Sequence, residues 1–203
     1  MTCLSALRTS LFAILVTFSV SNVAAQPPAL PGYIESDGIL VAPIPDTSAY
    51  FAYSKHGGKW RKHRFPGGMN VVPIIGNQCA VFALSGHVVT ELVAVDRTGN
   101  YRTIKLSKPT AKACTPVIGG KVAVVHVDGT VYAFSGITGA WDAVDAGGHV
   151  ANVDTEHAVL RTPDSISVFS AITGNWATAD LKDAAAKVAE WKHTDEKDTD
   201  RQP

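Results

Sequence analysis

The fold is decided by the stretch Val131-Tyr132-Ala133-Phe134-Ser135, followed by Gly136-Ile137-Thr138-Gly139-Ala140-Trp141. Its first five residues are of the β-branched, aromatic and small types that suit a buried, pleated strand. Gly139 can take the positive φ of a tight turn without a clash from a Cβ atom. Trp141 opens the next strand with a large flat side chain that can pack one sheet on its neighbour. The stretch therefore predicts two antiparallel strands joined by a tight turn.

The same glycine-x-aromatic pattern, preceded by an apolar strand, occurs four times along the chain. The four pairs are Gly58 and Trp60, Gly99 and Tyr101, Gly139 and Trp141, and Gly174 and Trp176. Their aromatic residues are 41, 40 and 35 residues apart. A period of this length in a β-rich chain is typical of propeller blades. Helical repeats of similar period are excluded by the β-branched alternation and the frequent glycine turns.

A whole blade can be traced in the third copy. Strands are expected at 115–119, 121–127, 130–135 and 141–144, and Asp128-Gly129 is a two-residue hairpin turn. We predict an all-β fold, a four-bladed or open, partial β-propeller-like array of four-stranded antiparallel blades. A short C-terminal α-helix should follow, because Leu181, Ala184, Val188 and Trp191 share one helical stripe.

The strand 131–135, the turn residues Thr138 and Gly139, and the Trp141-led outer strand resemble the blades of the Kelch family. The resemblance covers residues 38–180. It implies a β-propeller that presents its loops to a partner. It carries over no copper-ligand motif of the Kelch-like oxidases, so it implies no activity. The double glycine Gly119-Gly120 ends the first strand here, whereas in the family it ends the second.

Closure of the ring is left open by the sequence. The first copy begins at its second strand, near Gly38, so that either one inner strand is missing or the segment Pro27–Pro31 lies alongside. Four blades could close on themselves, or two chains could share a larger ring.

The chain ends have compositions unlike that of the repeats. Residues 1–25 have the order of a secretory signal, with Arg8, an apolar run to Val20 and the small residues Val23-Ala24-Ala25, and Gln26 would start the mature chain. We therefore expect export to the periplasm or to the outside of the cell. A Pro-rich leader at 26–37 and a helix with a polar tail at 181–203 complete the domain prediction.

Charge and cysteine content narrow the classes of function. Without residues 1–25 the chain has 17 Lys and Arg against 18 Asp and Glu, and this balance argues against a general nucleic-acid or membrane-surface binder. Cys79 and Cys114 are an even pair in an exported chain, so we expect a disulfide between them, with two buried free thiols as the alternative.

The densest positive charge is a candidate site for a polyanion. It comprises Lys55, Lys59, Arg61, Lys62 and Arg64, and no acidic residue interrupts 55–64. The alternative is a charged outer strand that resists edge-to-edge pairing.

No catalytic or metal-binding motif accompanies this patch. His87, His126, His149 and His157 lack the spacing of a metal site, and there is no nucleophile elbow and no phosphate-binding glycine loop. No cofactor is expected. The favoured hypothesis is a non-enzymatic exported module that binds a protein or a glycan. A glycan-acting or oxidoreductase-type propeller enzyme is one alternative, and a protein that completes its propeller by self-assembly is another.

Overall fold

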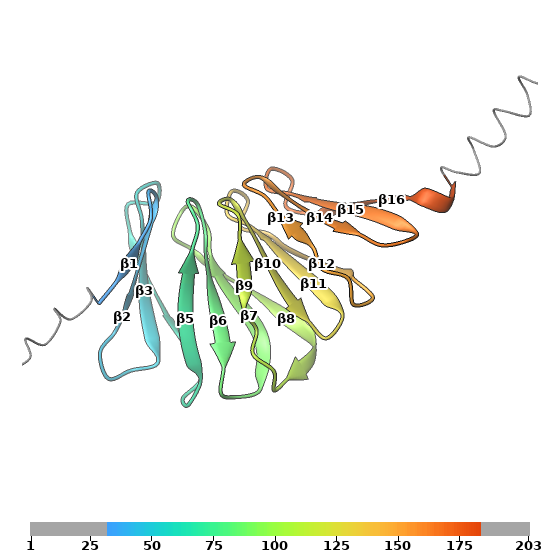
Figure 1. Ribbon diagram of the computed structural model, residues 1–203. Coiled ribbons are helices and arrows are strands. Elements are labelled where there is room, and N and C mark those ends of the chain that lie inside the picture. Colours follow the sequence, from blue (N-terminus) through green and yellow to red (C-terminus); the bar gives the residue numbers. More distant parts are fainter. Residues whose placement is uncertain (1–31, 184–203) are drawn as a thin grey trace, which may run out of the picture. The chain divides into compact units, whose positions relative to one another are not determined.

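The computed structural model describes residues 32–183, and these residues form four antiparallel sheets of four strands each (Figure 1). The first sheet contains β1 (Ile34–Glu35), β2 (Ile39–Pro43), β3 (Ala49–Ser54) and β4 (Trp60–Arg64). The second contains β5 (Asn70–Ile75), β6 (Ala80–Ser85), β7 (Val89–Val95) and β8 (Tyr101–Thr110). The third contains β9 (Pro116–Ile118), β10 (Val122–Val127), β11 (Thr130–Ser135) and β12 (Trp141–Asp145). The fourth contains β13 (Asn152–Val153), β14 (His157–Arg161), β15 (Ser165–Ser170) and β16 (Trp176–Asp180).

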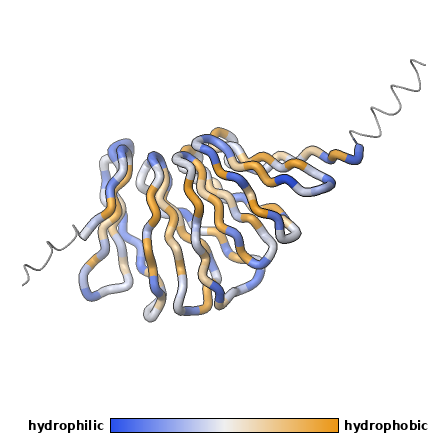
Figure 2. The backbone as a smooth tube through the Cα atoms, viewed as in Figure 1, coloured by the Kyte–Doolittle hydropathy of each residue, from blue (hydrophilic) through white to orange (hydrophobic). Residues whose placement is uncertain are grey.

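Within each sheet the strands follow chain order, with the repeat aromatic opening the fourth strand. This is the blade architecture of a β-propeller, and the predicted all-β, four-bladed propeller-like fold is confirmed. The third copy has the expected two-residue turn, with φ of 46° at Asp128 and 88° at Gly129. Figure 2 shows the hydrophobic residues concentrated along the strands.

The first sheet has all four strands. Its first strand is Ile34–Glu35, which pairs with Leu40 and Val41 and lies in the segment expected to be a leader. At the other end, residues 181–183 form a helical turn after β16. The expected stripe residues Ala184, Val188 and Trp191 and the expected signal peptide at 1–25 lie outside the described residues. Within 32–183, no helix has the length and apolar composition needed to cross a membrane.

Each sheet packs on the next one in the chain. One apolar core joins the first three sheets and includes Phe65, Phe82 and Phe134. A second core joins the third and fourth sheets around Leu160 and Phe169. Between residues 32 and 183, no hydrogen bond, ion pair or aromatic contact joins the first sheet to the fourth. The described sheets therefore form an array with a free face at each end.

The expected disulfide is wrong, because both Cys79 and Cys114 are free, buried thiols. Cys114 pairs with Leu84 through two backbone hydrogen bonds of 2.9 and 3.0 Å, whereas Cys79 immediately precedes β6. Five residues of extended strand separate Cys79 from Leu84, a distance of about 17 Å. A disulfide needs Cα atoms closer than about 7 Å. Burial raises the pKa of the Cys79 thiol to about 12, which keeps it protonated.

Candidate functional site

The basic patch predicted at 55–64 is divided by the strand geometry into two groups. Successive side chains of a strand point to opposite faces. Arg61 and His63 of β4 lie on the face toward the second sheet, where the His63 ring stacks on Tyr101 with centroids 5.0 Å apart. Lys62 and Arg64 lie with Trp60 on the opposite face. The structure therefore does not bring the five predicted cations together.

A cation from the second sheet joins the first group. The hydroxyl of Ser54 donates to the backbone carbonyl of Arg97, and a Cβ atom on Gly57 would come within 2.0 Å of the Thr98 carbonyl oxygen. The turn that follows β3 thus lies directly against the turn that follows β7. The exposed residues Lys55, Lys59, Arg61 and Arg97 share this region, which we call the basic turn surface.

Arg97 was missed by the sequence analysis, although a signal for it exists. Ser54 and Asp96 occupy the same repeat position, because each directly follows the residue that pairs with the repeat aromatic of its blade, Tyr53 with Trp60 and Val95 with Tyr101. Lys55 and Arg97 therefore occupy equivalent positions one residue later. Superposing the repeats in sequence would have placed both cations in neighbouring turns.

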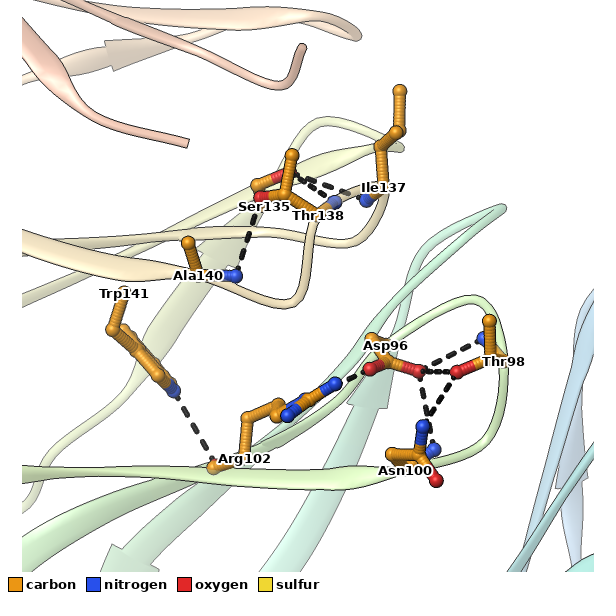
Figure 3. Close-up of polar contacts among 9 residues, drawn as sticks. All are labelled: Asp96, Thr98, Asn100, Arg102, Ser135, Ile137, Thr138, Ala140 and Trp141. Carbon is orange, nitrogen blue, oxygen red and sulfur yellow. Dashed lines mark hydrogen bonds and ion pairs between the residues drawn. The ribbon is translucent and has the colours of Figure 1, made fainter. Parts of the chain in front are cut away.

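The adjacent Asp96 and Arg102 form a structural network (Figure 3). The Asp96 Oδ1 atom accepts hydrogen bonds from Thr98 N at 2.9 Å and Asn100 N at 3.1 Å, and Oδ2 pairs with Arg102 Nε at 2.9 Å. Burial by itself raises the pKa of the Asp96 carboxyl. The hydrogen bonds from Thr98, Arg102 and Asn100 outweigh burial and bring this pKa below its ordinary value. Asp96 therefore neutralises Arg102 and organises its turn.

The second candidate surface is aromatic and lies on the free face of the first sheet. Phe51, Trp60 and Ala42 line a shallow hollow of about 360 Å³. The ring centroids of Phe51 and Trp60 are 6.0 Å apart at an interplanar angle of 74°, and the Tyr53 ring centroid lies 5.2 Å from that of Trp60. Trp60 is 55% exposed. Lys62 and Arg64 continue this face along β4.

The histidines of the chain are dispersed over the sheets. Across residues 32–183, no three His, Cys, Asp or Glu side chains gather closely enough to hold a metal ion. Burial lowers the pKa of His126 from its ordinary value. His126 lies on β10 of the third sheet, whereas His157 lies on β14 of the fourth sheet, with its Nε2 atom 3.9 Å from the Oδ2 atom of Asp154.

No protein-family model matches the chain, and no curated protein matches it in sequence. The solved structures that are similar to it include Kluyveromyces lactis Hsv2 and a streptogramin B lyase. Kluyveromyces lactis Hsv2 is 9% identical over 74% of this chain and 52% of its own, with a TM-score of 0.36. A streptogramin B lyase is 12% identical over 75% of this chain and 56% of its own, with a TM-score of 0.36. The chain thus spans about half the length of these two proteins. By its own four sheets, the protein is a propeller-like β-repeat protein.

Proposed function

We propose that this protein is an exported, non-enzymatic binding module whose basic turn surface binds an anionic glycan. The observation that carries the proposal is that the exposed cations gathered on this surface form no ion pair within residues 32–183. Several other cations are paired, as Lys112 is with Asp128, Lys121 with Glu156 and Lys182 with Asp164. In the described part of the chain, the four cations of the basic turn surface have no acidic partner.

Unpaired guanidinium and ammonium groups suit sulfate or carboxylate groups carried by a sugar. Arginine can grip such a group through two parallel hydrogen bonds, and lysine adds a mobile point charge. Lys55 and Arg97 stand on neighbouring sheets, whose spacing is about 10 Å. A linear chain with repeated anionic groups can therefore contact both turns together.

The type of blade and the export of the chain belong to the same proposal. We assign the repeats to the Kelch-like type because a Thr-Gly turn precedes a Trp-led outer strand. Export rests on the sequence pattern of residues 1–25. Its test is N-terminal sequencing of the protein recovered outside the cytoplasm, and a first residue other than one close to Gln26 would contradict it.

Binding is tested with a sulfated heparin hexasaccharide, titrated calorimetrically at two salt concentrations. The double variant Lys59→Ala and Arg97→Ala should raise the Kd at least about tenfold, equivalent to about 1.4 kcal/mol. The matched control is Lys105→Ala with Lys108→Ala, which removes two exposed cations of β8 and should leave the Kd unchanged. Affinity of the unaltered protein should fall as salt rises.

Three results would overturn the proposal. An unaltered protein that does not bind the hexasaccharide rules out the anionic glycan. Equal weakening by both double variants rules out the basic turn surface. Shortening of the hexasaccharide during incubation, followed by mass spectrometry, would make the protein a glycan-acting enzyme.

A further inference from the structure

The first sheet exposes apolar positions that the other three sheets bury. Phe51 is 38% exposed, whereas Val93, Tyr132 and Ser167 at the same repeat position are at most 3% exposed. These equivalences follow from the residues that pair with the repeat aromatic of each sheet, which are Tyr53, Val95, Phe134 and Phe169. Leu40 and Ala42 are likewise half-buried where the equivalent residues of the other sheets are fully buried. We call Leu40, Ala42, Phe51, Tyr53 and Trp60 the leading face.

Trp60 lacks the neighbour that its counterparts have. Tyr101 donates its hydroxyl to the carbonyl of Tyr50 in the preceding sheet, at 3.0 Å. Trp141 donates its indole N–H to the carbonyl of Arg102 in the preceding sheet, at 3.3 Å (Figure 3). The repeat aromatic therefore contacts the sheet before its own, and within residues 32–183 no sheet precedes that of Trp60.

The fourth sheet has the complementary surplus on its opposite face. Val168 is 37% exposed, whereas Ala52, Ala94 and Ala133 at the same position are fully buried. Ile172 is 70% exposed, whereas its counterpart Ile137 packs into the core shared with the fourth sheet. We call Val159, Ile166, Val168, Ile172, Ala177 and Ala179 the trailing face, which would contact the sheet after its own.

Hydrogen-bonding groups at the trailing face also lack their expected partners. Gln78 N donates to Gly120 O of the next sheet at 3.1 Å, and Lys121 N donates to Thr155 O at 2.9 Å. In the same series, the next donor is Glu156 N, which has no acceptor in residues 32–183. Ser135 donates its hydroxyl to the Ala171 carbonyl of the next sheet, and its counterpart Ser170 has no such acceptor in this range.

We propose that the trailing face of one chain docks on the leading face of a second copy, and that two copies close one eight-bladed ring. The faces match in shape, because the bulky Phe51 and Trp60 would meet the small Ala177 and Ala179. Their charges also match. The leading face continues into Lys62 and Arg64, and the trailing sheet ends in Asp164, Asp180 and Asp183, which outnumber Lys182 and leave this end net negative.

The repeat fixes the contacts expected at this junction. Trp60 would donate its indole N–H to the Ala177 carbonyl of the second copy, as Trp141 does to Arg102. Ser170 would donate to the Lys55 carbonyl, as Ser135 does to Ala171. Such a contact joins two different faces, so it produces a closed ring only when the rotations between successive copies add up to one full turn. Propellers typically have about four to eight blades, so two copies of this four-bladed chain reach the usual upper size and a third would exceed it.

The test is the solution mass of the purified full-length product, measured by light scattering on a sizing column over a concentration series. Twice the mass of one chain is expected. Trp60→Glu and Val168→Glu should each raise the dimer dissociation constant at least about a hundredfold, because each places a charge within the apolar junction. The control is Val72→Glu, which alters a β5 residue that is also 55% exposed and should leave the dimer intact. Far-ultraviolet circular dichroism of each variant verifies that it is folded.

A second measurement reports the pairing itself. Chains carrying Lys55→Cys are mixed with chains carrying Ser170→Cys and treated with a short bis-maleimide. A linked pair containing one chain of each kind supports the junction, and linking only between like chains contradicts it. A monomer at every concentration overturns the proposal and favours cover by the chain's own residues 184–203. A dimer that survives both glutamate substitutions, or an assembly that grows with concentration, overturns it equally. None of these readings depends on the glycan.

Discussion

The indole N–H of Trp141 lies 3.3 Å from the backbone carbonyl oxygen of Arg102 and joins the outer strand of the third sheet to that of the second. The same ring lies 4.9 Å from that of Phe134 within its own sheet. Trp141 therefore links the packing of its own blade to the position of the blade before it. Tyr101 makes the corresponding bond to the Tyr50 carbonyl of the first sheet, so the repeat aromatic joins neighbouring sheets at two junctions.

Replacing Trp141 by Phe should remove the hydrogen bond and keep most of the apolar contact. We expect a loss of about 1 kcal/mol in the free energy of unfolding, the usual net value of such a bond. Tyr101→Phe removes the corresponding bond between the second and first sheets and should cost a similar amount. Urea unfolding followed by tryptophan or tyrosine fluorescence measures both. Unchanged midpoints would show that these bonds do not stabilise the junctions.

Glycines at the junctions between sheets should tolerate no side chain. A Cβ atom on Gly119 would lie 2.0 Å from the carbonyl oxygen of Asp154, and one on Gly57 equally close to that of Thr98. Both contacts are with backbone, so the sheets themselves would have to move apart. We expect Gly119→Ala and Gly57→Ala each to lower stability by about 3 kcal/mol, at the upper end of typical overpacking costs.

The control for these substitutions is Gly67, which has open space around its Cβ position and no positive φ. Gly67→Ala should leave the thermal midpoint unchanged or raise it slightly, because alanine lowers the entropy of the unfolded chain. Equal destabilisation by all three substitutions would mean that the close approaches are not the cause.

The local rules of blade formation were readable in the sequence, and the relations between blades were not. Asp128-Gly129 and the four glycine-x-aromatic elements act within a few residues, so their strands and turns were predicted correctly. Cys114 lies opposite Leu84 near the end of β6, whereas Cys79 directly precedes that strand. The number of residues between the two cysteines does not predict this pairing. Arg61 and Lys62 point to opposite faces because successive side chains of a strand alternate, and this could have been predicted from the sequence. The partnership of Arg97 with Lys55 required the sheets to be placed side by side.

Asp96 should be more costly to replace than its serine counterparts suggest. Asp96 is 3% exposed, and its carboxylate accepts hydrogen bonds from Thr98, Asn100 and Arg102. Asp96→Ala leaves these donors unsatisfied, and we expect a loss of about 2–3 kcal/mol, in the range of bonds to charged groups. Asp96→Ser restores an acceptor of the kind found at 54, 135 and 170 and should recover part of this loss. Thermal unfolding of both variants at pH 7 decides the order, and a serine variant no more stable than the alanine variant would contradict it.

His63 should make the protein less stable as the pH falls below neutrality. Burial lowers the pKa of its imidazole below the ordinary 6.5, and the charge of Glu91 only partly opposes this. The unfolded chain therefore binds a proton at a higher pH than the folded chain does. Unfolding takes up a proton in the window below 6.5, so the free energy of unfolding decreases as the pH falls through it.

His63→Phe keeps an aromatic ring against Tyr101 and removes the titrating group. Its stability should change less between pH 7.5 and pH 5.5 than that of the unaltered protein, as measured by urea unfolding at each pH. His126 also has a pKa lowered by burial, so a residual slope is expected, and His126→Val should reduce it further. A slope that His63→Phe leaves unchanged would mean that the imidazole accepts its proton in the folded protein as readily as in the unfolded chain. The stack of His63 on Tyr101 would then have to open without cost, and the first and second sheets would be held by their backbone contacts and the buried core around Phe82.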